Sequence, residues 1–193
     1  MNHLAHLFLS QSDPELMVGN FIADHVKGKK ILSFTDKIQK GIRMHRAIDE
    51  FTDHHEIVRK SKERLYPTYH KYASVIVDMF YDHILARNWK KYSPIELKSF
   101  SNSTYKVLNA FCDSMPQTSQ RFLFYMEKGD WLKNYSSYEG IGQALSGLSR
   151  RAKFDSKMEL AVADLEKDIQ DYEAEFEQFF PKLNEYCIEW LKS

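Results

Sequence analysis

The feature that most constrains the fold of this chain is the helical spacing of its apolar residues, which few helix-breaking residues interrupt. Only seven glycines and five prolines occur in 193 residues, and no stretch alternates apolar and polar residues as a half-buried strand does. We therefore predict an all-α fold that ends in a long helix, which Pro181 kinks or divides in two. The pattern is clearest near the end of the chain, where apolar residues recur at three- and four-residue intervals: Met158, Val162, Leu165, Ile169, Tyr172, Phe176, Phe179 and Leu183.

Capping residues and prolines divide the rest of the chain into further helices. The run Ser12-Asp13-Pro14-Glu15 joins a capping side chain to a proline suited to a first helical turn, and we expect this helix to stop at Gly28. Thr35 or Ser33 can cap the helix that follows. The expected helices cover residues 2–10, 14–27, 36–53, 55–65 (closed by Tyr66-Pro67), 70–91 and 94–115 (opened by Ser93-Pro94), with two more between 117 and 150.

The length of the chain suits one domain with a buried core, with or without an appended helical hairpin. We expect a single domain over residues 1–193, in which residues 1–92 carry a metal site and residues 93–193 form a helical scaffold. Cys112 and Cys187 lack metal-site spacing, and two unpaired thiols suit a reducing cytoplasm better than a disulfide scaffold. The first ten residues lack the basic region of a signal peptide, and no apolar run approaches a membrane span, so we expect a cytoplasmic protein.

Charge is balanced over the whole chain but unevenly distributed along it. Basic and acidic residues both total 27, yet residues 1–154 carry a net charge of +7 and residues 155–193 a net charge of −7. The positive part is too weakly charged for a nucleic-acid binder, but its charge is enough to steer a small acidic protein. The acidic end suits a solvated helix face, or else the surface through which a non-catalytic helical module binds a partner.

All eight histidines lie within the first 83 residues, and several are one helical turn from an aspartate. Residues four apart share a helix face, so His45 and Asp49 line one ridge together with Asp53, and Asp78 and Asp82 line another. Asp24 falls in the second expected helix, four residues after Asn20. A bundle that joins these three helices would bring five side chains to one interior point: Asp24, His45, Asp49, Asp82 and His83.

Imidazole and carboxylate together suit manganese, iron or zinc better than calcium, and magnesium remains an alternative if waters complete its shell. A single His–Asp pair is also common on a solvated surface. However, Asp49 is flanked by Ile48 and Phe51, and a carboxylate on an apolar stripe costs several kcal/mol unless it is paired or metal-bound. The pattern therefore predicts a shared metal site. Arg43 and Arg46 bracket His45, where guanidinium groups suit a phosphate oxygen or, alternatively, neighbouring carboxylates.

Four segments of the first 92 residues occur in a fixed order: M-N-H-L-A-H-L-F-L-S, G-N-F-I-A-D-H-V-K-G, I-Q-K-G-I-R-M-H-R-A-I-D-E-F-T-D-H-H and D-M-F-Y-D-H-I-L-A-R-N-W. Together they resemble the acyl carrier protein phosphodiesterase family, also called acyl-carrier-protein hydrolase, whose members are distant relatives of the HD-type metal-dependent phosphohydrolases. The rest of the chain resembles the family only in length and helical character.

The resemblance implies an HD-domain-like helical bundle and a manganese-dependent phosphodiesterase. Such an enzyme removes the 4′-phosphopantetheine arm from the serine of holo-acyl carrier protein and regenerates the apo form. The HD superfamily is named for an adjacent His-Asp pair, whereas this chain has only the reverse order, at residues 24–25, 53–54 and 82–83. Its ligand set must therefore be rearranged along the chain. The family motifs fall on His6, Asn20, Asp24, His45, Arg46, Asp49, Asp53, Asp82 and His83.

By this resemblance, one or two metal ions are held by Asp24, His45, Asp49 and Asp82, with His83 or His6 as a further ligand. Whichever of these two histidines is free of metal donates a proton to the leaving serine oxygen, while Arg46 and Arg43 neutralise charge on the phosphoryl oxygens. The remaining histidines, His3, His25, His54, His55 and His70, are expected to support the site or lie on the surface. The acidic carrier protein is expected to dock on basic residues near the site, namely Lys27, Lys29, Lys30, Arg59 and Arg64.

Two rival functions fit the same sequence. One keeps the metal site but takes a nucleotide or another small phosphoester as substrate. The other is the non-catalytic interaction module, which a helical fold alone does not exclude.

Overall fold

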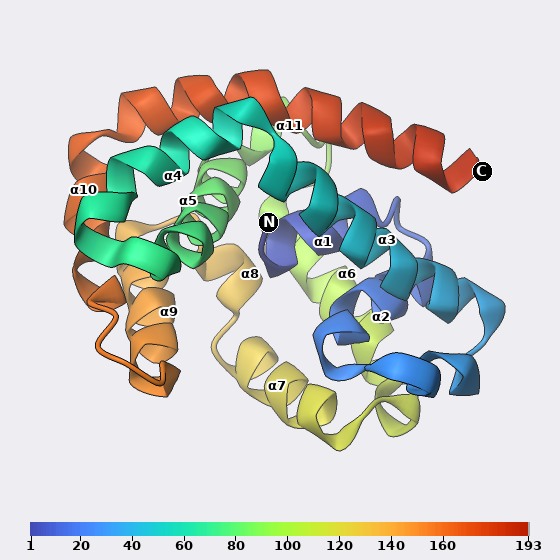
Figure 1. Ribbon diagram of the computed structural model, residues 1–193. Coiled ribbons are helices and arrows are strands. Elements are labelled where there is room, and N and C mark those ends of the chain that lie inside the picture. Colours follow the sequence, from blue (N-terminus) through green and yellow to red (C-terminus); the bar gives the residue numbers. More distant parts are fainter. Residues whose placement is uncertain (193) are drawn as a thin grey trace.

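The computed structural model describes residues 1–192, and within them it contains helices and no β-strand, which confirms the predicted all-α class (Figure 1). The α-helices are α1 (His3–Leu9), α2 (Pro14–Ile22), α3 (Asp36–His54), α4 (Glu56–Tyr69), α5 (Ala73–Arg87), α6 (Leu97–Ala110), α7 (Gln117–Lys128), α8 (Trp131–Asn134), α9 (Tyr138–Arg151), α10 (Ala161–Lys167) and α11 (Ile169–Lys192). Short 3₁₀ helices join them: η1 (Ala23–His25), η2 (Gly28–Ser33), η3 (His70–Tyr72), η4 (Trp89–Lys91), η5 (Cys112–Ser114) and η6 (Met158–Leu160).

The predicted caps of α2 and α3 are present, but α2 is shorter than expected. The Asp13 carboxylate accepts the backbone N–H groups at the start of α2, and Thr35 Oγ1 accepts the N–H of Ile38 at the start of α3. The predicted stop at Gly28 is wrong, because α2 ends at Ile22 and tightens into η1, as the last turn of a helix often does. Asp24 therefore lies in a 3₁₀ turn rather than on the face of α2.

Helices α2 and α3 touch backbone to backbone through Gly19 and Gly41. A Cβ at Gly19 would lie 2.1 Å from the carbonyl oxygen of Ile38, and one at Gly41 would lie 2.4 Å from that of Leu16. Any side chain at either position would have to push the helices apart. The pair of glycines thus fixes how closely α2 approaches the helix that carries His45 and Asp49.

One core joins apolar side chains from both halves of the chain, and α11 lies across it (Figure 1). Tyr172, Phe176 and Phe179 are fully buried, as the spacing of the final segment predicts. The predicted division at Pro181 and the predicted end at Pro67 are both wrong, since α11 and α4 continue through these prolines. Both prolines are exposed, so the carbonyl that each leaves without an N–H donor can turn to water.

Other helix ends also differ from the sequence pattern. The expected helix over residues 70–91 is α5 flanked by η3 and η4, and α6 begins only after the Ser93-Pro94 turn. Three helices rather than two lie between residues 117 and 150, because Asp130 adopts a left-handed conformation (φ 41°) and separates α7 from the short α8. Cys112 and Cys187 are free thiols, as expected.

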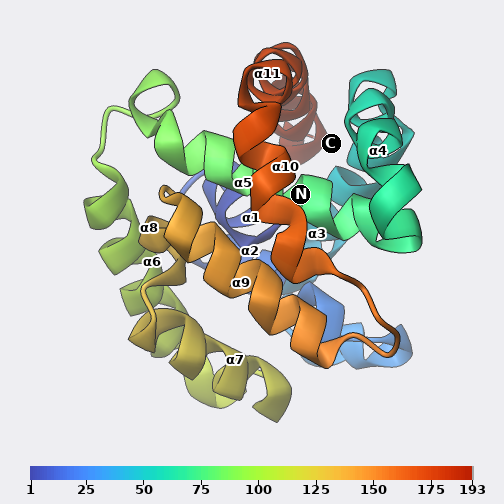
Figure 2. The same ribbon diagram turned by 90° about the vertical axis from the view of Figure 1, so that its left-hand side faces the viewer.

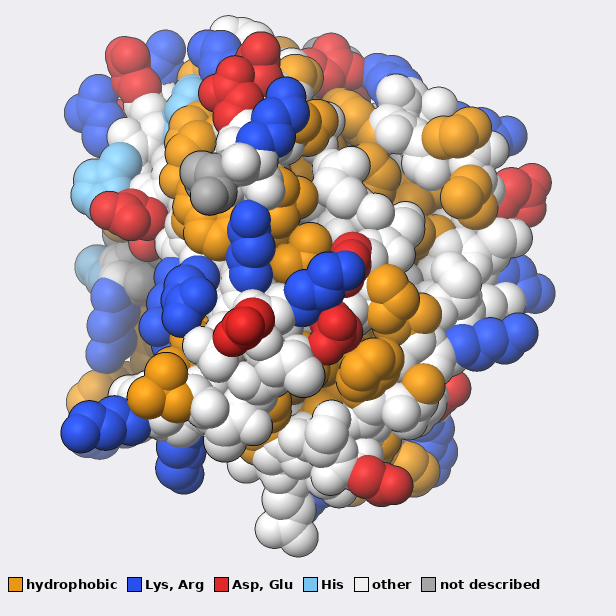
Figure 3. Space-filling model, turned by 90° about the vertical axis from the view of Figure 1, so that its right-hand side faces the viewer, with side chains coloured by type: hydrophobic (Ala, Val, Ile, Leu, Met, Phe, Trp, Pro, Cys, Tyr) orange, Lys and Arg blue, Asp and Glu red, His pale blue; other side chains and the backbone are white. Residues whose placement is uncertain are grey.

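Carboxylates of the acidic α11 bind basic side chains of the same chain. Glu175 accepts from Arg64 at 2.8 Å, and Glu173 lies 3.7 Å from Arg87. On the face in Figure 3, Lys and Arg side chains lie among acidic and apolar ones rather than in one continuous patch. Within residues 1–192, no helix combines the length and apolar character that a membrane crossing requires.

Candidate metal centre

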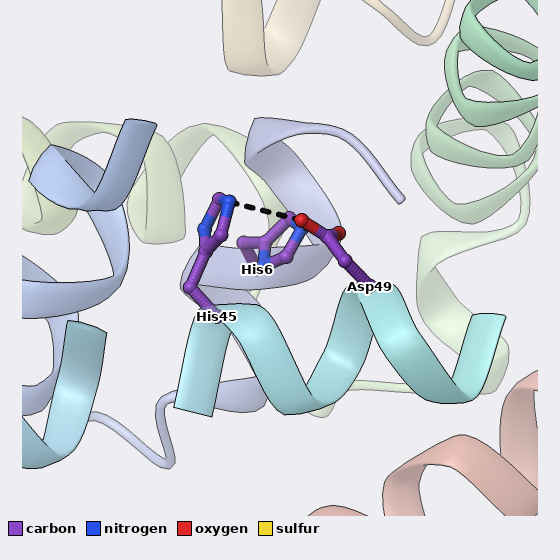
Figure 4. Close-up of side chains that lie close together, drawn as sticks. All are labelled: His6, His45 and Asp49. Carbon is purple, nitrogen blue, oxygen red and sulfur yellow. Dashed lines mark hydrogen bonds and ion pairs between the residues drawn. The ribbon is translucent and has the colours of Figure 1, made fainter. Parts of the chain in front are cut away.

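Two imidazoles and a carboxylate converge between α1 and α3. His6 projects from α1, and His45 and Asp49 lie one turn apart on α3 (Figure 4). The Asp49 carboxylate bridges the rings, with Oδ1 3.1 Å from His6 Nε2 and Oδ2 3.2 Å from His45 Nε2. The two rings stack with their centroids 4.0 Å apart. One potential ligand atom from each residue lies within 4.8 Å of the others, which is the spacing that a shared cation needs.

Asp24 adds a second carboxylate on the solvent side of this cluster. Its Oδ1 lies 3.4 Å from His45 Nε2, and its side chain is 66% exposed. It lies in the 3₁₀ turn η1, where the tighter winding gives residue 24 a direction different from the one a continued α2 would give it. Three ligands, the two imidazole nitrogens and the Asp49 carboxylate, therefore face one point, and Asp24 lies next to them beside His45.

Asn20 sets the orientation of both histidine rings. Its Nδ2 donates to the backbone oxygen of His6 and to Ser10 Oγ, so Oδ1 must be the acceptor that faces the rings. Oδ1 lies 2.9 Å from His6 Nδ1 and 3.0 Å from His45 Nδ1. Both Nδ1 atoms therefore carry a proton, and in the neutral form of each ring the Nε2 lone pair points toward Asp49.

The cluster contains more hydrogen-bond acceptors than protons that can be donated to them. Burial and the neighbouring His45 lower the pKa of His6 to about 4, so this ring is neutral at pH 7. Its unprotonated Nε2 then faces only acceptors, the Asp49 carboxylate and the Met1 carbonyl oxygen at 3.1 Å. A lone pair enclosed by acceptors is costly, and a cation between Nε2 and the carboxylate would relieve it. The donor set thus fits a divalent metal.

The carboxylates are ionised, as metal ligands must be. Hydrogen bonding to His45 lowers the pKa of Asp24 to about 2. Burial raises the pKa of Asp49, but hydrogen bonding to His45 outweighs burial and holds this pKa well below its usual range. Burial opposes protonation of His45, but hydrogen bonds to Asp24 and Asp49 prevail and raise its pKa to about 9. A bound cation would take the place of that proton.

A cavity of about 360 Å³ opens over the cluster and brings in residues to which the sequence assigned no role. His3 lines it, and burial lowers the pKa of His3 to about 3, so this ring is also neutral. Asp78 lines it as well, with Oδ1 2.9 Å from the Met1 amino group. The spacing of Asp78 and Asp82 was a signal for an acidic ridge on α5, but nothing in the sequence indicated which of the two reaches the site. Asp53, a family-motif residue, lies at the rim and binds Lys62 at 2.7 Å.

Asp82 does not reach the cluster, contrary to the expected ligand set. It is fully buried beneath the start of α1, where its carboxylate accepts three backbone N–H groups, those of Asn2 (3.3 Å), Leu4 (2.7 Å) and Ala5 (3.3 Å). Both oxygens are thus used to cap α1, a role that favours a carboxylate at the positive end of a helix. Asp82 holds His6 in place through the backbone instead of binding a metal.

His83 points away from the cluster, so its expected place as a ligand or proton donor does not fit. Its Nδ1 donates to the Tyr135 backbone oxygen at 2.7 Å, and its ring stacks on Tyr138. The 100° turn between adjacent helix residues explains this, because Asp82 and His83 face different neighbours. His6, the alternative to His83 as a ligand, is the one that lies in the cluster.

The basic residues predicted around the site divide into two groups. Arg46 is exposed next to η1, where its Nη2 donates to the Val26 backbone oxygen at 3.2 Å, and Arg43 donates to Gln39. The lysines beside η2 are exposed too: Lys27, Lys29 and Lys30. By contrast, Arg59 and Arg64 on α4 bind Glu63 and Glu175 of the same chain.

The remaining histidines lie outside the cluster. His25 binds Ser119 Oγ at 2.8 Å, and His54 contacts the backbone oxygen of Glu50. His55 caps α4 by accepting the N–H of Ile57, and His70 is exposed at the end of the same helix. These positions agree with the supporting or surface roles expected of them.

Comparison with known proteins extends the resemblance beyond the first 92 residues. The family model described as acyl carrier protein phosphodiesterase matches residues 1–183. Proteins named acyl carrier protein phosphodiesterase include one from Photorhabdus laumondii that is 30% identical over 97% of this chain and 99% of its own length. Another, from Escherichia coli O6:H1, is 33% identical over 96% of both chains. No solved structure matches this chain, so the HD-like arrangement stays a prediction.

Proposed function

Because this chain belongs to the acyl carrier protein phosphodiesterase family, the members of which are phosphoric diester hydrolases, we propose that it releases 4′-phosphopantetheine from holo-acyl carrier protein. The observation that carries the proposal is the enclosed lone pair of His6 Nε2, which faces Asp49 and the Met1 carbonyl oxygen. An interaction module has no need for such a cluster, whereas a metal-assisted hydrolase does.

His6, His45, Asp49 and Asp24 would hold the metal, and this set replaces the one expected from the sequence. Manganese suits two imidazoles with two carboxylates, and iron, zinc and magnesium remain alternatives. When bound, such a cation supplies Lewis acidity toward a phosphoryl oxygen and lowers the pKa of a coordinated water.

The chain's own residues then have distinct roles. Asn20 holds both Nδ1 protons, so that both Nε2 atoms would face the metal. Asp24 is ionised and exposed at the mouth of the site, as a carboxylate that binds a cation must be. Arg46 lies beside the turn that carries Asp24, where its guanidinium can pair with phosphoryl oxygens.

A carrier protein would dock over η2 rather than over α4. Lys27, Lys29 and Lys30 are exposed and adjoin the turn of Asp24, whereas Arg64 is already bound to Glu175. An acidic partner gains association rate from free basic groups, and it gains little from groups that are already paired. The proposed docking surface therefore keeps the three lysines and leaves out the arginines of α4 that the sequence had also suggested.

Mass spectrometry of holo-acyl carrier protein after incubation with this protein and Mn²⁺ tests the proposal. We expect loss of the phosphopantetheine mass, and no loss with Asp24→Ala or His45→Ala. Nucleotides assayed in parallel separate the rival substrate class. An unchanged carrier mass with wild-type protein that contains bound metal would contradict the proposed substrate.

A further inference from the structure

Two further cavities continue from the site cavity along α9. The inner groove, of about 260 Å³, shares Asn2, His3 and Leu148 with the site cavity. At its other end it meets an open outer cavity of about 900 Å³, with which it shares Phe122, Trp131 and Gly147 among other residues. Figure 2 shows α9 in front with α7 below it, the two helices that supply much of this lining.

The lining of the inner groove is neutral along most of its length. Apolar groups come from Met79, Phe122 and Leu148, and side-chain amides come from Asn2, Asn134 and Gln143. Its charged groups, Arg150 and Arg151, also line the outer cavity. Such a lining suits an uncharged, elongated ligand that carries amide groups.

Gly147 marks the junction of the two cavities, and neither packing nor backbone strain accounts for it. It is an interior residue of α9 without a positive φ, where glycine is less stable than alanine. A Cβ built there would meet only Arg150 Nη2, at 3.9 Å. Gly19, Gly41 and Gly140 differ, because a Cβ at each would clash with backbone. The missing side chain at residue 147 instead keeps the junction open.

We propose that the inner groove binds the pantetheine arm of the substrate, with the phosphate at the metal centre and the thiol end near Gly147. The arm has two amides, a gem-dimethyl group and a terminal thiol, which match the amide and apolar groups of the lining. Its thiol end would reach the outer cavity, which leaves room for an attached acyl group. This inference rests on the proposed function, since it assigns a place to the part of the substrate that is released as 4′-phosphopantetheine.

Gly147→Trp tests the groove, with Gly147→Ala as the matched control. The indole would fill the junction, so we expect kcat/KM for holo-acyl carrier protein to fall roughly tenfold or more, while alanine leaves it within about twofold. Hydrolysis of bis(p-nitrophenyl) phosphate, a small diester that has no arm, should be equal in both variants and the wild type. Added 4′-phosphopantetheine should inhibit the alanine variant more strongly than the tryptophan variant.

Ala144→Trp, on the same wall of the groove, provides a second obstruction if the first variant does not fold, and thermal unfolding reports on folding in each case. Normal cleavage of holo-carrier by folded, obstructed variants would overturn the groove assignment and leave the proposed function intact. A wild-type protein that cleaves only the small diester would instead overturn the proposed substrate.

Discussion

Two histidine–aspartate pairs look alike in the sequence but have opposite surroundings in the fold. On α3, His45 and Asp49 face a cavity open to solvent, and the side chain of Asp49 is 42% exposed. On α5, Asp82 and His83 are fully buried. Backbone N–H groups satisfy Asp82, whereas His83 donates from Nδ1 to the Tyr135 backbone oxygen and its buried Nε2 has no hydrogen-bond partner. The same residue types therefore make a candidate metal site in one helix and a structural support in the other. What distinguishes them is the group that each side chain meets, which residue spacing does not specify.

The largest difference between the two pairs is expected in the catalytic rate, which should depend on Asp49 far more than on the buried Asp82. Asp49→Asn removes the negative charge that lies between both rings. We expect the variant to lose several kcal/mol of transition-state stabilisation by the metal, and its rate should therefore fall about a thousandfold. Its unfolding free energy should change by less than about 1 kcal/mol, because the side chain is half-exposed. Carrier-mass loss and urea unfolding measure the two effects, and a fully active variant would exclude Asp49 as a ligand.

Asp82 should show the reverse behaviour. Asp82→Ala leaves three buried backbone N–H groups without an acceptor, which should cost roughly 3 kcal/mol or more of unfolding free energy. Asp82→Asn keeps one acceptor oxygen and should lose less. Urea denaturation of both variants tests this, and an alanine variant as stable as the wild type would show that Asp82 does not support α1.

Asn20 provides a further test of the difference between the two pairs, because its side chain orients the rings of the α1–α3 site only. Asn20→Ala frees both rings to rotate and should weaken Mn²⁺ binding about 10- to 100-fold in calorimetric titration. Ser10→Ala is the matched control, since Ser10 Oγ contacts Asn20 Nδ2 but neither ring. Equal Mn²⁺ affinities for the two variants would remove the orienting role from Asn20.

His83 should have the smallest effect on catalysis, and its ionisation should be visible in the pH dependence of stability. Burial lowers its pKa below 6.5, so the unfolded chain binds the proton first and this contribution to stability is lost as pH falls below about 6.5. Between pH 7.5 and 5.5, His83→Gln should therefore lose less unfolding free energy than the wild type. Urea midpoints at the two pH values measure this, and parallel losses would show that His83 does not titrate on unfolding.

Helical periodicity was enough to predict the all-α class and the buried face of α11. It was not enough for the helix ends, because a proline does not always end a helix: α4 and α11 continue through Pro67 and Pro181, and both prolines are exposed. The sequence and the family motifs also named His6, His45 and Asp49, which the structure brings together. Separating them from Asp82 required knowing that α1 begins on top of α5, a contact between residues far apart in the chain.

The backbone contact between Gly19 and Gly41 makes the candidate site depend on two residues that have no functional group. Asn20 follows directly after one glycine, and His45 lies one turn beyond the other, so the width of a methyl group between the helices would separate the amide from the His45 ring. Screens for inactive variants should therefore recover changes at these glycines. A small molecule wedged between α2 and α3 would inhibit hydrolysis without ever contacting the phosphate.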